Sequence, residues 1–463
     1  FFVLQKAVYD LFPERKLHIK HSVAKGFYCE IEGMEDLSDE QIVRIKERMR
    51  AIVAQDLPIV RQKVTSAEAE AMYEALGLDD KIALLRTRPH LYVTVYSMAD
   101  LVGYFYGALA VSTGYVSRFD LHPYYKGFRM ALPQRTDPTK LEELVPQDKM
   151  FEVFSEYTRW VDVIGVANIG SLNARILEGG GSDLIRIAEA LHEKALGNLA
   201  DRIYERHRDG GARIVLISGP SSSGKTTFAK RLGIQLSILG MRPVLVSLDD
   251  YFVDREKTPL DEDGEYDDLA ALLAGREVGM PRYNFITGKS EPNHRTLRMD
   301  ERSVLLIEGI HGLNPRLTPQ IDAAMKFKVY VSALTSIAMD DLNRIATTDN
   351  RLIRRIVRDH RTRGNSATAT LRRWESVRRG EDKHIFPNQE QADVMFNSSL
   401  FYELAVLKDC VWPLLREVPD TEPEFGEARR LLKFLDHFTS LDGKEIPPTS
   451  ILREFIGGSS FEY

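Results

Sequence analysis

The 463-residue sequence contains only two cysteines, Cys29 and Cys410. They lie far apart and form no metal-ligand pair, which excludes a disulfide framework and suits a reducing compartment. No run reaches the roughly 18 apolar residues that a membrane span needs. The chain starts at Phe1 without a basic-then-apolar leader. We therefore expect a cytoplasmic protein without a membrane partner, and one that lacks some of its native N-terminal residues.

The sequence also lacks an excess of basic charge, since its net charge is −6. A protein that binds nucleic acid or membranes over much of its surface needs a basic surface, so the net charge argues against that class. The net charge says nothing about local basic patches. Apolar residues make up 43% and charged residues 28%, which is typical of a soluble globular protein. There is no internal repeat and no low-complexity segment. The length predicts two or three domains.

A glycine-rich stretch, Gly219–Thr227, follows the apolar run Ile214–Ile217 and precedes a helical pattern. Its spacing fits the phosphate-binding loop G-x-x-x-x-G-K-[ST] in the required strand–loop–helix context. An ordinary Gly/Ser turn rarely supplies Lys225-Thr226 and both flanking elements together. In such a loop the lysine reaches the β- and γ-phosphates and the following hydroxyl ligates Mg²⁺. The predicted nucleotide-binding residues are Gly219, Ser221, Ser222, Ser223, Gly224, Lys225, Thr226 and Thr227, with ATP and Mg²⁺ as cofactors.

Strand and helix patterns alternate from residue 213 onward, which predicts an α/β domain with a parallel sheet between helices. In such sheets ligands lie beyond the carboxyl ends of the strands. Two acids follow predicted strands directly, Asp249 and Glu308. Asp249 is a candidate general base or Mg²⁺ ligand, although an Asp-Asp pair also caps turns. Glu308 ends an apolar run and is a candidate to orient a Mg²⁺-bound water. The predicted strands are 213–218, 244–248, 304–308, 327–331 and 393–396.

Six arginines occur within residues 351–363. A solvated helix usually alternates charge signs, whereas this one has the single acid Asp359. A nucleic-acid patch is one interpretation. A cationic lid over a transferred phosphoryl group accounts better for the bias, because arginine stabilises charge spread over phosphoryl oxygens. Gly364 offers a hinge at its end.

Residues 213–415 resemble the uridine kinase/phosphoribulokinase family of P-loop kinases. The resemblance rests on the phosphate loop, Asp249–Phe252, Pro281–Phe285, Ile307–Ile310 and the arginine run through Gly364. It implies that Asp249 is the general base on the acceptor hydroxyl and contributes with Thr226 and Glu308 to the metal site. It further implies catalytic roles for Lys225, Arg358 and Arg363, phosphate contact by Arg355, and acceptor contacts by Asp249, Tyr251, Asp267, Tyr283 and Arg355.

The sequence departs from the pyrimidine kinases of that family at three places. Gly288 stands where they carry a base-reading histidine, Asn365 replaces a later lid arginine, and the segment from Asp267 to Pro281 is short. We expect phosphoryl transfer to the 5′-hydroxyl of a nucleoside or a related small alcohol. An RNA-associated P-loop NTPase or regulator and a phosphosugar kinase are the alternatives. The choice between ATP and GTP and the presence of a homo-oligomer stay open.

The first 80 residues resemble the accessory editing-type domain of threonyl- and alanyl-tRNA synthetases, on His21-Ser22, Gly26-Phe27-Tyr28 and the acidic turn and helix that follow. The metal chemistry of that family needs an H-x-x-x-H pair and a later Cys and His. Here His18 and His21 are three apart and Arg88-Pro89-His90 has no Cys directly before its histidine, so no metal site is predicted. The whole chain resembles two-part bacterial uridine kinase-like proteins.

The predicted domains are an accessory-like domain at 1–80, a β-rich α+β extension at 81–180, a connecting helix at 181–211, the P-loop kinase domain at 212–425 and a tail packing on it at 426–463.

Overall fold

The fold was analysed on a computed structural model. It describes residues 1–88, 90–134, 137–251, 272–273, 275–284 and 289–462. The chain divides into two compact units, each described by itself below. The first unit is assembled from three separate segments, residues 1–180, 336–346 and 436–439. The second unit comprises residues 181–335, 347–435 and 440–463.

The second unit contains a five-stranded parallel sheet in the order β14-β13-β8-β12-β9. All five strands were predicted, because each is a short apolar run bounded by turn residues. The central strand β8 and its neighbour β12 are buried along their whole length. The α/β fold class is thereby confirmed. The strands are β8 (Ile214–Ser218), β9 (Arg242–Ser247), β12 (Ser303–Glu308), β13 (Lys326–Ser332) and β14 (Val394–Asn397).

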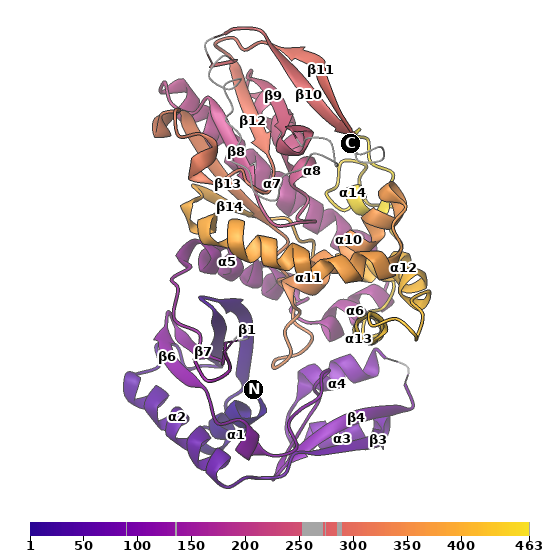
Figure 1. Cartoon of the computed structure of the whole chain (residues 1–463). Helices are drawn as coiled ribbons and strands as arrows, with labels where there is room; N and C mark the ends of the chain where they lie inside the picture. Colours follow the sequence, from indigo (N-terminus) through magenta and orange to yellow (C-terminus); the bar gives the residue numbers. More distant parts are fainter. Residues whose placement is uncertain (89, 135–136, 252–271, 274, 285–288, 463) are drawn as a thin grey trace. The chain divides into compact units, whose positions relative to one another are not determined.

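Helices flank this sheet (Figure 1). Helix α7 packs against α8, and α8 packs on β9 and β12. A two-stranded antiparallel hairpin, β10 (Val278–Asn284) with β11 (Lys289–Leu297), was not expected from the sequence. The helices are α7 (Gly181–Arg208), α8 (Lys225–Ile238), α10 (Thr347–Arg363), α11 (Ala367–His384), α12 (Glu403–Arg416), α13 (Phe425–Leu435) and α14 (Arg453–Ile456).

The first unit contains two antiparallel sheets and several helices (Figure 1). One sheet has the order β1-β2-β7-β6 and the other β3-β4-β5. Two helices of this unit start at capping boxes, Ser38 with Gln41 and Thr65 with Glu68. The strands are β1 (Leu17–Val23), β2 (Gly26–Ile31), β3 (Val60–Thr65), β4 (Tyr92–Met98), β5 (Leu101–Gly103), β6 (Asp120–Tyr124) and β7 (Gly127–Ala131).

Helices in the first unit also occupy residues for which the sequence suggested β structure. The segment 81–180 is extended in β4 to β7, but it is helical in α5 (Asp148–Ile164) and α6 (Ile169–Leu177). The apolar stripe of α5 buries Met150, Phe151 and Phe154. The other helices are α1 (Phe2–Leu11), α2 (Asp39–Ala54), α3 (Ser66–Ala75) and α4 (Asp79–Arg86). Within the described ranges, no helix has both the length and the apolar character needed to cross a bilayer.

Candidate functional site

The predicted phosphate loop lies between β8 and α8. Gly224 precedes the helix with φ +78°, a conformation that favours glycine. A Cβ on Gly219 would lie 1.9 Å from the carbonyl oxygen of Val331, so no side chain fits there. Helix α8 begins at Lys225, which places the N–H groups of its first turn at the loop. The local geometry therefore presents an anion-binding helix terminus.

The carboxyl ends of neighbouring strands bring Glu308 beside the loop. Glu308 ends β12, where it is in register with Ser247 at the end of β9. Its Oε1 accepts hydrogen bonds from Ser247 Oγ at 2.9 Å and from Thr226 Oγ1 at 3.2 Å. A hydroxyl and one carboxylate are the protein ligands that Mg²⁺ takes beside substrate phosphates. Thr226 and Glu308 thus fit a Mg²⁺ site, and Ser247 is a neighbour that the sequence reasoning missed.

Glu308 is buried and Lys225 is half-buried beside the phosphate loop. Burial lowers the pKa of Lys225, and the charges of Glu308 and Asp249 offset part of that effect. Burial raises the pKa of Glu308 to about 7, while the nearby Lys225 ammonium opposes the shift. Lys225 Nζ donates to the carbonyl oxygen of Pro220 at 3.3 Å. The lysine is therefore folded back onto its own loop.

Asp249 lies in a single 3₁₀ turn, Leu248–Tyr251, that directly follows β9. Its charge influences the pKa values of Glu308, Lys225, His311 and Arg363. Asp249 is thus close to Lys225 and to Arg363 at the end of the arginine run. This arrangement is compatible with the predicted general base and metal ligand, and both roles stay predictions.

Three of the predicted lid arginines meet at one carboxylate. Asp359, which is buried, pairs with Arg355 Nε at 3.2 Å, Arg358 Nη2 at 2.8 Å and Arg363 Nη1 at 3.6 Å. Arg355 Nη1 also donates to Ser221 Oγ in the phosphate loop at 2.6 Å. The single acid of the run therefore gathers Arg355, Arg358 and Arg363 into a cationic cluster, which we call the Asp359 cluster. Burial lowers the pKa of Arg363, as does the charge of Arg358.

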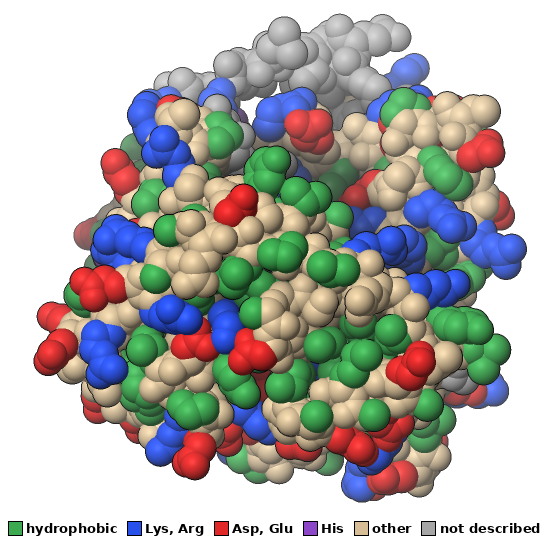
Figure 2. Space-filling view, turned by 90° about the horizontal axis from the view of Figure 1, so that it is seen from below, with side chains coloured by type: hydrophobic (Ala, Val, Ile, Leu, Met, Phe, Trp, Pro, Cys, Tyr) green, Lys and Arg blue, Asp and Glu red, His purple; other side chains and the backbone are tan. Residues whose placement is uncertain are grey.

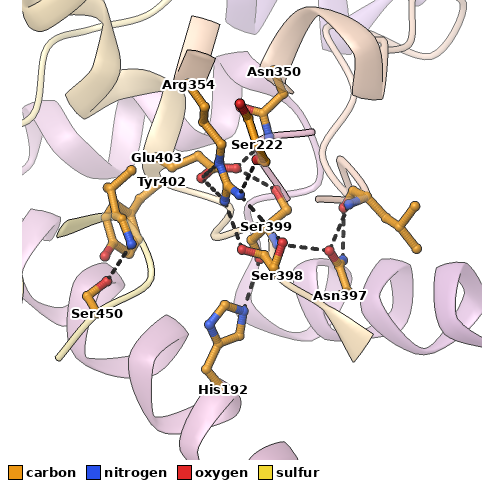
Figure 3. Close-up of polar contacts among 12 residues, drawn as sticks. His192, Ser222, Asn350, Arg354, Asn397, Ser398, Ser399, Tyr402, Glu403 and Ser450 are labelled. Carbon is orange, nitrogen blue, oxygen red and sulfur yellow. Dashed lines mark hydrogen bonds and ion pairs between the residues drawn. The ribbon is translucent and has the colours of Figure 1, made fainter. Parts of the chain in front are cut away.

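Two other arginines of the run, Arg351 and Arg354, are buried and donate hydrogen bonds to the backbone of the phosphate loop. Arg351 forms a buried two-point ion pair with Glu381 and donates to the carbonyl oxygen of Ser221 at 3.1 Å. Glu381 also accepts the N–H of Ser221 at 3.0 Å. Arg354 pairs with Glu403 (Figure 3). Arg351 and Arg354 thus support the loop, and Arg361 donates to the carbonyl oxygens of Glu454 and Phe455. Contact of the Asp359 cluster with a ligand stays a prediction.

Several predicted acceptor residues lie wholly or partly outside the described part of the structure. Asp267 and Gly288 lie outside the described residues. Tyr251 is the last residue of the 3₁₀ turn and Tyr283 lies in β10. Their side chains are likewise outside the described part. The acceptor half of the site therefore stays a prediction from the sequence.

Glu454 is the most unexpected residue at the loop. Its Oε2 accepts hydrogen bonds from the backbone N–H of Thr227 at 3.3 Å and from Thr227 Oγ1 at 2.6 Å. The sequence reasoning missed it because nothing around position 454 signals phosphate binding. Glu381 was missed for the same reason, although an acid opposite an arginine-rich helix is a weak signal for ion pairing.

The histidines of the first unit are not assembled into a metal site. His21 is stacked on Phe154 with ring centroids 4.3 Å apart, and His18 Nδ1 lies 3.1 Å from Asp341 Oδ1. Among the described residues, no group of three or more His, Cys, Asp or Glu side chains is arranged to hold a metal. Beside His21, the buried Phe151 is stacked on the exposed Tyr125 with ring centroids 3.7 Å apart.

The parallel sheet, the phosphate loop with its lysine and the acid at the end of β12 define the second unit as a P-loop kinase-type domain. Residues 251–401 match the "Phosphoribulokinase / Uridine kinase family". The chain therefore carries a domain of this family, as the sequence motifs predicted. The matched range begins after the phosphate loop and is narrower than the 213–415 expected.

The N-terminal region matches threonyl-tRNA synthetase sequences. The threonine–tRNA ligase of Geobacter sp. (strain M21) is 32% identical over 119 residues, 26% of this chain and 19% of the ligase. That of Rubrobacter xylanophilus is 34% identical over 118 residues, 26% of this chain and 18% of the ligase. The chain thus spans about a fifth of the length of these curated relatives.

A solved structure described as "a Possible Uridine Kinase from Bacillus stearothermophilus" is 21% identical, with a TM-score of 0.27, over 43% of this chain and 100% of that one.

Proposed function

We propose that the protein is an ATP- and Mg²⁺-dependent kinase that phosphorylates the 5′-hydroxyl of a nucleoside or a related small alcohol. The observation that carries the proposal is the convergence of Lys225, Glu308 and Asp249, whose charges act on one another beside the phosphate loop. A base, a metal-binding acid and a phosphate-binding lysine around one point are the parts that phosphoryl transfer to a hydroxyl requires.

In this proposal each described side chain has a defined task. Thr226 and Glu308 would hold Mg²⁺, and Lys225 with the first-turn N–H groups of α8 would bind the nucleotide phosphates. Asp249 accepts the proton of the acceptor hydroxyl. The Asp359 cluster supplies positive charge to the transferred group. ATP would supply the phosphoryl group, and Mg²⁺ would neutralise part of its charge.

The direct test is a panel of nucleosides and small alcohols incubated with MgATP, with ADP release as the readout. The proposal predicts ADP release that depends on one acceptor class. A nucleoside panel that yields no more ADP than a reaction without acceptor contradicts the nucleoside assignment. A thermal-shift screen complements it, because a ligand at 100 times its Kd adds about 2.7 kcal/mol of apparent stability. Including pentose phosphates in both panels tests the phosphosugar alternative, which the name of the matched family motivates.

The similarity of the N-terminal region to threonine–tRNA ligases favours a second candidate, an RNA-associated NTPase. Against it, Arg129 is buried and donates to the carbonyl oxygens of Ala24, Lys25 and Glu142, so it is not presented to a nucleic acid. Figure 2 shows acidic and basic side chains interspersed on the face it views. Salt-dependent tRNA binding together with ATP hydrolysis that needs no small acceptor would favour this candidate over the kinase.

A further inference from the structure

The C-terminal segment 446–462 of the second unit is seated against the phosphate loop. Phe455 is fully buried, and its ring lies 4.9 Å from the Arg354 guanidinium. A Cβ on Gly224 would be 2.5 Å from Ile451 Cγ2, so this isoleucine lies directly on the loop. Arg361 donates to the carbonyl oxygens of Glu454 at 2.8 Å and Phe455 at 3.1 Å. These contacts fix where the side chain of residue 454 lies.

The carboxylate of Glu454 occupies hydrogen-bond donors that a phosphate loop offers to its ligand. It accepts from both the backbone N–H and the hydroxyl of Thr227, within the first turn of α8. Backbone N–H groups at this point of a phosphate loop cradle the α- and β-phosphates. The negative charge of Glu454 also acts on Lys225 and Lys230. A carboxylate oxygen thus stands where a phosphate oxygen of the nucleotide would be bound.

We propose that Glu454 is a built-in competitor of the nucleotide, so that the C-terminal segment must release Thr227 before the phosphates bind. The inference rests on the proposed function. One N–H and one hydroxyl cannot serve two anions at once, and a carboxylate beside a phosphate is repelled by it. The apparent Kd for nucleotide is then the intrinsic Kd divided by the fraction of molecules in which the segment is displaced.

Several contacts hold the segment in place, and one of them lies at the phosphate loop. Ile451, Leu452 and Phe455 are buried, and Ser450 Oγ donates to Glu189 Oε1 at 2.5 Å. Its other polar attachments include Arg361 to two carbonyl oxygens, Lys230 to the carbonyl oxygen of Glu462, and Glu454 to Thr227. Nucleotide binding removes the last of these attachments and so weakens the hold of the segment. The proposed device therefore couples occupancy of the loop to the position of the C-terminus.

The test is the affinity for MgATP and MgADP, measured by calorimetry on the full chain without acceptor. Glu454→Gln removes the competing charge while keeping the shape of the side chain. It should lower the Kd by at least about fivefold, because hydrogen bonds to a charged acceptor are about twice as strong as neutral ones. The matched control is Glu445→Gln, whose carboxylate pairs with Arg186 and Ser182 instead; its Kd should equal that of the unmodified chain.

An equal or weaker affinity of Glu454→Gln overturns the inference and leaves the kinase assignment intact. Absence of nucleotide binding by the unmodified chain and by the variant overturns the proposed function and this inference together. Hydrogen exchange on the unmodified chain gives an independent reading that needs no variant. Amides of residues 451–457 should exchange faster when MgATP is added, and unchanged or slower exchange contradicts the release of the segment.

Discussion

Arg354 connects the carboxylate of Glu403 to the backbone of the phosphate loop. Its Nε lies 2.9 Å from Glu403 Oε2, and its Nη1 donates to the carbonyl oxygen of Ser222 at 3.4 Å (Figure 3). Glu403 is held in turn by Asn350 at 2.6 Å and Ser399 at 2.7 Å. Both members of the pair are almost completely buried. The shape of the loop thus depends on an ion pair between α10 and α12.

Breaking this pair should destabilise the second unit strongly. Glu403→Gln leaves the Arg354 guanidinium buried without its counter-charge, and removing one partner of a buried pair costs about 3–5 kcal/mol. Urea unfolding followed by circular dichroism measures the loss. Glu422→Gln is the control, because that carboxylate pairs with the exposed Arg372 and exposed pairs contribute at most about 1 kcal/mol. Similar free energies of unfolding for both variants would contradict the structural role of the pair.

Lys225→Ala should abolish turnover. The substitution removes the ammonium at the loop, and the proposed mechanism has no other cation at that position. We expect a loss of at least about three decades in kcat/KM, in line with the loss of a preorganised charge on the transferred group. The measurement is ADP release with the best acceptor of the panel. A Tm close to that of the unmodified chain establishes that the variant is folded, and residual activity within tenfold would remove Lys225 from the site.

Asp249→Asn should lower the rate by about two to four decades, the usual contribution of a general base. The amide keeps the size of the side chain but cannot take up the hydroxyl proton. The effect should fall on kcat rather than on the Kd for nucleotide, which separates it from a general distortion of the loop. Asp420→Asn, at an exposed position, serves as the control. A rate near normal for Asp249→Asn would assign the base to another group.

The stability of the first unit should fall as the pH decreases from 7.5 to 5, in part because of His21. Burial among aromatic rings lowers the pKa of His21 to about 3. The unfolded chain takes up a proton near pH 6.5 and the folded one does not, so the histidine destabilises the fold below that pH. The expected contribution at pH 5 is about 2 kcal/mol.

His21→Phe should remove that contribution while preserving the stack on Phe154. Urea unfolding at the two pH values measures it, with His122→Asn as control at an exposed position. The control should retain the full dependence on pH. If His21→Phe retains it as well, the histidine is accessible to protons in the folded state.

The sequence predicted the parts of the site whose signals are local. The phosphate loop and the acid at the end of β12 each lie within a few residues, and their geometry follows from that spacing. The five strands were predictable because buried parallel strands are continuous apolar runs. The order of the strands, by contrast, is a property of pairing between distant segments.

The different structural roles of the arginines in residues 351–363 could not be predicted from the sequence. Arg351 and Arg355 lie one turn apart on the same helix, yet one is buried against Glu381 and the other reaches Ser221 Oγ. What separates them is the packing of α11 and α12, which come later in the chain. The role of Glu454 could not be predicted for the same reason, since its contact with Thr227 joins residues 227 positions apart. Non-local packing decides such roles.

The first unit includes two short segments from far along the sequence, residues 336–346 and 436–439. Lys81, fully buried, pairs with Asp340 at 3.0 Å, and Asn173 donates to the carbonyl oxygen of His437 at 2.7 Å. During synthesis the first 180 residues therefore emerge long before their partners. Until residue 340 is made, the Lys81 ammonium has Asp80 at 3.6 Å but lacks its closer counter-charge, and until residue 437 is made, Asn173 has the hydroxyl of Thr87 but lacks its second acceptor. The first unit is therefore completed only after residue 437 has been translated, which makes this protein a natural subject for ribosome-arrest folding experiments.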